Sequence, residues 1–173
     1  MSGFDEAREE RNWLERLAAK IPGFKGFMNR ELRRETDKMQ REHLAEELGR
    51  LKGRGRELAR EYTDVGKIGV LDGFERLDRR LDGLSQSIRF ADYGLTGLFD
   101  AVKIDESDLE KLYEFDLSIL DDLEAVGAGL SAIPSPGDGD PDEALAVVSQ
   151  QLSELTDKWS RRETVINNAV EAR

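Results

Sequence analysis

The chain has 173 residues, of which 36% are charged and 38% are hydrophobic, and its 37 acidic residues outnumber its 26 Lys and Arg. No apolar run approaches the roughly 20 residues that a transmembrane helix requires. The chain contains no Cys, which excludes disulfides, thiolate metal sites and Cys nucleophiles. Charges run through residues 1–20, so we expect no secretory signal and a cytoplasmic location.

The charge is divided unevenly along the chain. Residues 1–60 hold 15 Lys or Arg and 12 Asp or Glu, a net charge of +3, whereas residues 61–173 carry a net charge of −14. Between Ile104 and Asp157 the only base is Lys111, against 15 acids. Two interpretations stay open: a basic front that pairs with the acidic back, within one molecule or between copies, or a charged face that keeps the protein soluble.

Residues 1–24 predict an N-terminal amphipathic helix. Its apolar face carries Trp13, Leu14, Leu17 and Ile21 at helical spacing. The sequence Ile21-Pro22-Gly23 ends this helix, because proline restricts the residue before it and glycine permits a turn.

Residues 25–103 predict a long helical hairpin that turns near Thr63–Gly66. Apolar residues in its first arm step by 4 and 3 positions: Leu44, Leu48, Leu51, Gly55, Leu58 and Tyr62. The second arm repeats the steps: Val70, Phe74, Leu77, Leu81, Leu84, Ile88, Ala91, Leu95, Leu98 and Val102. This spacing indicates coiled-coil-like packing. The first arm begins with a mostly ionic half, which needs cover from the C-terminal helices or another subunit.

Two acidic helices are predicted at 104–133 and 140–172, and each has an apolar seam with steps of 3 and 4 residues. The seam of the first is Leu109, Leu112, Asp116, Ile119, Leu123, Val126, Leu130 and Ile133, and that of the second is Leu145, Val148, Leu152, Leu155, Trp159, Arg162 and Ile166. Ser107 and Glu110 read as a capping box for the first, and Asp140 reads as the N-cap of the second. No stretch alternates with a period of two residues, so we expect no strand. The sequence predicts one helical domain over residues 1–173, an all-α antiparallel helical bundle of about five helices.

His43 and Asp116 are candidate buried polar residues, since both lie on predicted apolar seams. A lone His43 does not suffice for a zinc or di-iron site, so we expect a packed or snorkelling side chain. A buried Asp116 needs a partner, which Arg89 or Arg162 could supply, and such a pair would set the helix register. Partial exposure and a catalytic role for Asp116 stay open as alternatives.

The run Arg50, Lys52, Arg54 and Arg56 is a candidate interaction surface. It has no aromatic residues to stack on bases and the whole chain is acidic, so we expect no nucleic-acid partner. Our interpretation is that the run meets the acidic C-terminal half of the same chain or of a neighbouring copy.

The N-terminal aromatic group of Trp13, Phe24, Phe27 and Met28 is the best candidate for membrane contact. An interfacial helix shows Lys and Arg on its polar face, whereas this segment mixes bases with acids. Core packing is therefore the expected use, with membrane contact as the alternative.

Four segments resemble a group of small uncharacterised prokaryotic all-helical proteins. They are Ile21–Phe27 (IPGFKGF), Glu31–Asp37 (ELRRETD), Ile88–Ala101 (IRFADYGLTGLFDA) and Leu112–Asp116 (LYEFD). The resemblance implies a single compact unit and brings no known activity, ligand or site residues. Phe90, Tyr93 and Phe99 are candidate contact residues, with ordinary packing at a helix break as the alternative.

The sequence shows no phosphate-binding loop, Gly-x-Ser-x-Gly elbow or paired-acid signature with supporting context. We therefore expect no catalytic, cofactor-binding or metal-binding residues, and no cofactor. The hypothesis is a non-enzymatic helical scaffold, adaptor or self-assembling protein, whose partner is another protein or a second copy in a homo-oligomer. The alternative is a peripheral membrane-associated stress or envelope accessory that docks through the N-terminal aromatic segment. A carboxylate metal enzyme is a third hypothesis.

Overall fold

The computed structural model describes residues 15–24, 30–91 and 106–171. Four long helices lie in this part of the chain: α2 (Arg30–Asp64), α3 (Leu71–Phe90), α5 (Glu106–Ser131) and α6 (Asp142–Glu171). A short 3₁₀ helix, η1 (Ile68–Val70), joins α2 to α3, and residues 15–20 are helical. The described residues contain no strand, so the prediction of an all-α bundle is confirmed.

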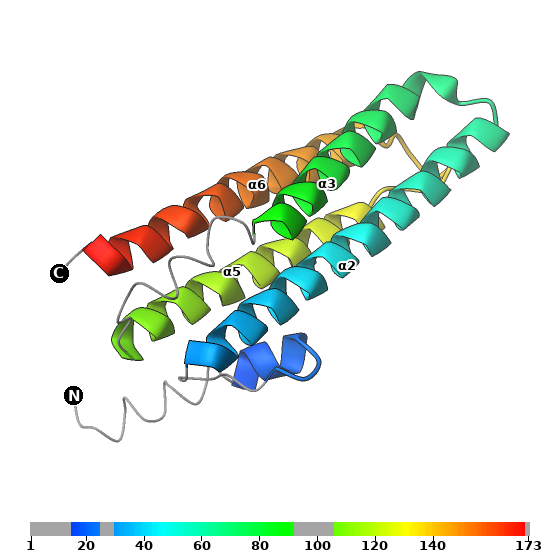
Figure 1. Cartoon of the computed structure of the whole chain (residues 1–173). Coiled ribbons are helices and arrows are strands. Elements are labelled where there is room, and N and C mark those ends of the chain that lie inside the picture. Colours follow the sequence, from blue (N-terminus) through cyan, green and yellow to red (C-terminus); the bar gives the residue numbers. More distant parts are fainter. Residues whose placement is uncertain (1–14, 25–29, 92–105, 172–173) are drawn as a thin grey trace, which may run out of the picture.

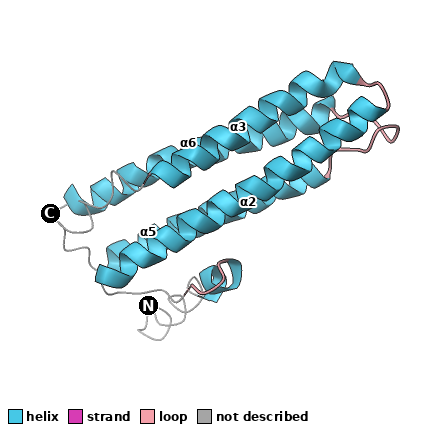
Figure 2. Cartoon of the chain, turned by 45° about the vertical axis from the view of Figure 1, so that its right-hand side comes forward, coloured by secondary structure: helices cyan, strands magenta, loops and turns pink. Residues whose placement is uncertain are grey.

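The four helices pack side by side as two hairpins. Helix α2 packs on α3 and α5, and α6 packs on α5 and α3, which leaves α2 diagonally opposite α6. Figure 1 shows α2 and α5 running in one direction and α3 and α6 in the other, and the turned view in Figure 2 agrees. Each hairpin, α2–α3 and α5–α6, is therefore antiparallel, and the contacts between the hairpins join parallel helices.

The predicted apolar seams face one another in the core. Their buried members are Leu44, Leu48, Leu58 and Tyr62 on α2, Phe74, Leu77, Leu81, Leu84 and Ile88 on α3, and Leu145, Val148, Leu152, Leu155 and Trp159 on α6. Helix α5 has a wider buried stripe that adds Tyr113, Leu117 and Leu120 to its seam. The stripe is wider because residues 15–24 cover α5 as well, with Phe24 edge-on to Tyr113 at 5.9 Å.

Helix ends differ in part from the prediction. Helix α3 ends at Phe90, and residues 92–105 of the predicted seam lie outside the described residues. Ser107 is already helical, so it is not the N-cap that the predicted capping box requires, and the residues before Glu106 lie outside the described residues. Asp140 caps the start of α6 in part as predicted: its Oδ1 accepts a hydrogen bond from the Asp142 N–H at 3.0 Å, but α6 begins at Asp142, so Asp140 lies one residue before the N-cap position.

The turn of the first hairpin is tied to the loop of the second. Gly66 has φ of 76°, and the Lys67 N–H donates to the Tyr62 carbonyl at 2.9 Å, which ends α2 in a glycine-terminated turn. The Tyr62 hydroxyl donates to the Pro134 carbonyl oxygen at 2.8 Å. This hydrogen bond joins the loop ends of both hairpins.

Candidate functional site

Oppositely charged side chains from three helices meet inside the bundle. Arg162 of α6 donates from Nε to Asp116 Oδ1 of α5 at 2.6 Å and from Nη2 to Asp116 Oδ2 at 2.9 Å. The same Nη2 lies 2.9 Å from Oδ1 of Asp37 on α2. Asp37 Oδ2 in turn accepts from Arg41 Nε at 2.8 Å. These four side chains, the buried charge network, are each at most 7% exposed.

The buried charge network is neutral when both of its carboxylates are ionised. Burial raises the pKa of Asp116, and the charge and hydrogen bonds of Arg162 oppose this shift. Burial by itself lowers the pKa of Arg162, but Asp116 and Asp37 outweigh burial, so the pKa is raised and the guanidinium stays charged. The arrangement acts as a tie between helices, because the loss of any member leaves a buried charge without its counter-ion.

Gln40 and Thr36 of α2 extend the polar layer, at 1% and 4% exposure. Gln40 is a small influence that opposes the rise in the pKa of Asp116. Among the described residues, however, neither amide atom of Gln40 nor Arg162 Nη1 makes a hydrogen bond of normal geometry. The contact between Asp37 Oδ1 and Arg162 is likewise an ion pair without an aligned hydrogen bond. Hydrogen-bonding capacity therefore remains inside this layer.

The structure confirms that Asp116 is buried on the seam and that Arg162 is its partner, while Arg89 is exposed. The sequence prediction misses Asp37 and Arg41. A signal for them exists, because counting back from Leu44 by 3 and then by 4 residues reaches Arg41 and Asp37. The seam thus continues into the ionic half of α2, with opposite charges at a spacing that lets them pair.

His43 is half-buried, so the prediction of a buried seam histidine is met only in part. It precedes Leu44, which is 1% exposed, and therefore lies at the edge of the seam. In the parts of the chain that the structure describes, no group of three or more His, Asp or Glu side chains is placed to hold a metal ion.

The candidate basic run lies on the outer side of α2. Its acidic partners are Glu46 and Glu47 for Arg50, Asp82 for Lys52, Glu57 and Glu61 for Arg54, and Asp78 for Arg56. Glu46, Glu47 and Glu57 lie on α2 beside the run, whereas Glu61, Asp78 and Asp82 belong to the acidic part of the chain, residues 61–173. The expected pairing with the acidic part of the same chain is therefore met in part, through the end of α2 and α3, while pairing with a neighbouring copy stays a prediction. The reason is local: α3 packs beside α2, and acids three or four residues away lie on the same helix face.

A shallow groove of about 320 Å³ lies between α2 and α3. Gly55 and Ala59 of α2 are small and leave room for the groove. Phe74, Leu77 and Leu81 of α3 form much of its apolar floor. The charged rim comprises Lys52, Arg56, Glu75, Asp78 and Arg79. The groove thus opens on the outer surface of the first hairpin, and the buried charge network does not line it.

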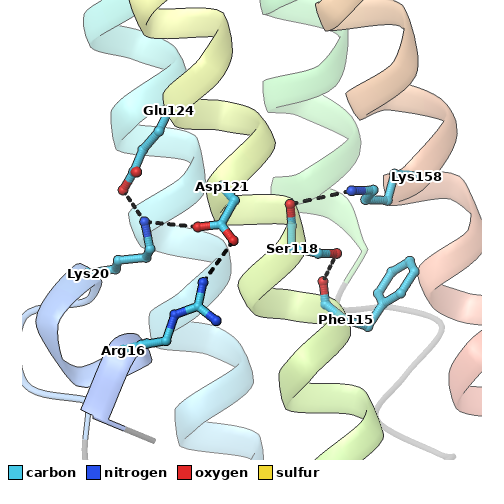
Figure 3. Close-up of polar contacts among 7 residues, drawn as sticks. All are labelled: Arg16, Lys20, Phe115, Ser118, Asp121, Glu124 and Lys158. Atoms are coloured by element: carbon cyan, nitrogen blue, oxygen red, sulfur yellow. Dashed lines mark hydrogen bonds and ion pairs between the residues drawn. The ribbon is translucent and has the colours of Figure 1, made fainter. Parts of the chain in front are cut away.

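The expected pairing of the basic front with the acidic back also occurs at the N-terminal segment. Arg16 Nη2 lies 3.2 Å from Asp121 Oδ2, and Lys20 Nζ lies 3.1 Å from Asp121 Oδ1 (Figure 3). Lys20 also forms an ion pair with Glu124. These contacts hold the segment on the outer side of α5.

Apolar residues of this segment are part of the core. Leu17 and Ile21 are fully buried and Phe24 is 6% exposed, so core packing is confirmed for them. Trp13 and the pair Phe27 and Met28 lie outside the described residues. Membrane contact through the aromatic group therefore stays a prediction.

The last candidate contact group is only partly described. Phe90, at the end of α3, is 63% exposed, whereas Tyr93 and Phe99 lie outside the described residues. None of the helices that the structure describes is both long enough and apolar enough to cross a bilayer.

No family model, curated protein or solved structure matches the chain. The similarity to small prokaryotic helical proteins therefore stays a prediction, and function is argued from the residues themselves.

Proposed function

We propose that the protein is a cytoplasmic, non-enzymatic helical scaffold or adaptor that acts through protein–protein contacts, including contacts with its own copies. The observation that supports this proposal best is the outer surface of the α2–α3 hairpin. Charged side chains of both signs cover this surface, and the groove with an apolar floor lies between its helices.

The chemistry of the buried polar residues favours contact over catalysis. Arg162 forms ion pairs with both Asp116 and Asp37, and these pairs join three helices. A catalytic acid needs access to a substrate, whereas these side chains are closed off from solvent. We assign them to holding the helices in register.

The N-terminal segment provides an example of the contact that we propose. Leu17 and Ile21 bury their side chains against the bundle, while Arg16 and Lys20 pair with acids of α5 at the rim. An apolar centre with a charged rim is also the usual anatomy of an interface between proteins. The outer side of the hairpin offers the same combination to a partner.

Light scattering tests the proposal on purified full-length protein over a range of concentrations in low and high salt. We expect a mass above the 19.5 kDa of one chain in low salt, and a decrease in high salt, because exposed charge pairs are screened. Chemical cross-linking in cells tests the adaptor role. A protein that is monomeric under all conditions and cross-links to no other protein contradicts the proposal.

A further inference from the structure

The solvent side of α2 carries a second regular stripe, opposite the core. Its members are Glu42, Glu46, Gly49, Gly53, Arg56 and Arg60, and all six are exposed. They follow one another at steps of 4, 3, 4, 3 and 4 residues. This is the spacing that lines up residues along one side of a helix in a coiled coil. We call these six residues the outer stripe.

The charges of the outer stripe are ordered along the helix. Glu42 and Glu46 precede the two glycines, and Arg56 and Arg60 follow them. Each member has a counterpart at the same distance on the other side of residue 51, and the charged members have counterparts of opposite charge. A second copy laid antiparallel across this position sets each acid against an arginine, whereas a parallel copy sets like charges together.

We propose that two copies of the chain associate through α2, packed antiparallel along the outer stripe. Glu42 then faces Arg60 of the second copy, Glu46 faces Arg56, and Gly49 faces Gly53. Because the two chains are related by a two-fold axis, each of these contacts occurs twice and the assembly closes as a dimer. This inference rests on the proposed function and names its surface and its partner.

The two glycines support this geometry. A Cβ added at Gly49 or Gly53 would meet nothing within 4 Å, so packing inside the chain does not require glycine there. Glycine inside a helix costs about 0.5–1 kcal/mol relative to alanine. Small residues at a crossing point let two helix axes approach closely, which gives glycine a use at the centre of the proposed interface.

Contacts within the chain leave these charges available. Glu46 Oε2 lies 4.0 Å from Arg50, and Glu42 Oε1 lies 3.8 Å from Lys38, and such exposed pairs contribute little to stability. Arg56 binds Asp78 but its side chain is 59% exposed. A guanidinium has several N–H donors and can therefore hold a second carboxylate.

Charge reversal tests the pairing directly. Glu46→Arg and Arg56→Glu each bring like charges together twice, so we expect each variant to dimerise at least ~10-fold more weakly than the wild type. In an equimolar mixture, each variant supplies the charge that the other needs. We therefore expect the mixture to form a heterodimer of about wild-type affinity, measured by sedimentation equilibrium in low salt.

Further variants separate a lost interface from a lost fold. Glu42→Arg and Arg60→Glu form a second pair for the same mixing experiment, in which the ion pair between Arg56 and Asp78 is kept intact. Gly53→Gln puts a long side chain at the crossing point and should abolish the dimer. Gly83→Gln on α3 is the matched control, because Gly83 is also exposed with nothing within 4 Å of an added Cβ. Circular dichroism checks the helix content of every variant.

The absence of native Cys allows a test of the register. Chains with Gly49→Cys and chains with Gly53→Cys should form disulfides faster with each other than with themselves, because the antiparallel pairing sets position 49 against position 53. A parallel, in-register pair gives the reverse preference and overturns the proposal.

The outcomes distinguish this inference from the proposed function. A wild-type oligomer that ignores the charge reversals overturns the α2 interface, while the scaffold function stands. Single variants that fail to associate when mixed also overturn it. A wild type that stays monomeric overturns the dimer, and cross-linking to another protein then decides whether the adaptor function survives.

Discussion

Arg162 and Asp116 form a two-point ion pair between α6 and α5, with N–O distances of 2.6 and 2.9 Å, and neither side chain is more than 3% exposed. The same guanidinium lies 2.9 Å from Asp37 of α2. One side chain therefore links three helices. Since the charges were removed from water to form this contact, the energy of the network depends on all of its members being present.

Replacing Arg162 with methionine should strongly destabilise the bundle. The Arg162→Met variant puts an apolar side chain in place of the guanidinium, which lies 5.3 Å from the centre of the Trp159 ring, and leaves Asp116 and Asp37 buried with Arg41 as the remaining base of the network. We expect the free energy of unfolding to fall by about 3–5 kcal/mol, measured by urea denaturation. The neighbouring Arg161 is exposed, so Arg161→Met should change the free energy of unfolding by less than about 0.5 kcal/mol. Equal effects for both variants contradict the role of the network.

Removing both members of the pair should cost less than removing one. In the double variant Asp116→Leu with Arg162→Met, the Asp37 and Arg41 pair remains and the Asp116 carboxylate is absent. We expect the double variant to be at least ~2 kcal/mol more stable than Arg162→Met alone. Additive losses in the double-mutant cycle would show that the two side chains act independently.

Tyr62 should make the protein sensitive to alkaline pH. Burial raises the pKa of Tyr62, and Asp140, Asp138 and Glu61 add to the shift. The phenol of an unfolded chain ionises near pH ~10. The stabilising contribution of the neutral phenol is therefore complete below that pH and is lost as the pH rises through the folded pKa.

The Tyr62→Phe variant tests this pH dependence. At neutral pH it loses the hydrogen bond to the Pro134 carbonyl, which should lower the free energy of unfolding by about 1 kcal/mol. The difference from the wild type should shrink above pH ~10, because the variant has no phenol at this position to ionise. Urea denaturation from neutral to alkaline pH measures both curves. Parallel curves argue against a raised pKa for Tyr62.

Glycines at two kinds of position should respond differently to alanine. Gly83 is exposed and open, so Gly83→Ala should raise the free energy of unfolding by about 0.5–1 kcal/mol through helix propensity. At Gly129 an added Cβ would lie 2.5 Å from Gln151 Oε1 and 3.0 Å from Val148 Cγ2. We expect Gly129→Ala to gain less or to lose stability, because the Gln151 side chain must swing away and the Val148 methyl must shift. Thermal unfolding compares the two variants, and equal gains contradict the close approach of α5 and α6.

The N-terminal segment should be a stabilising part of the core. Leu17 is fully buried, so Leu17→Ala should cost about 2–4 kcal/mol and release residues 15–24 to proteolysis. The neighbouring Arg16 has an exposed ion pair, and Arg16→Ala should cost less than about 1 kcal/mol. Vesicle flotation of the wild type addresses the membrane alternative. Rapid cleavage of the wild-type segment at a rate equal to that of Leu17→Ala contradicts its place in the core.

The amino-acid sequence by itself determined the elements and their buried faces. The steps of 3 and 4 residues predict which side of α2, α3 and α6 is apolar, because hydrophobic burial acts through local helix periodicity. The same periodicity places Asp116 and Arg162 on seams. Helix ends are less well predicted, because capping groups compete within one turn: Ser107, the predicted N-cap of α5, lies inside the helix.

Only the tertiary structure decided which side chains meet. The sequence offers two bases, Arg89 and Arg162, as possible partners of Asp116. The packing of α6 against α5 selects Arg162. The basic run of α2 likewise finds its acids on α2 and α3, because ion pairs depend on distances set by helix packing and not on the charge of a distant part of the chain. Periodicity is a local property of a chain, whereas the choice of partner is a property of its fold.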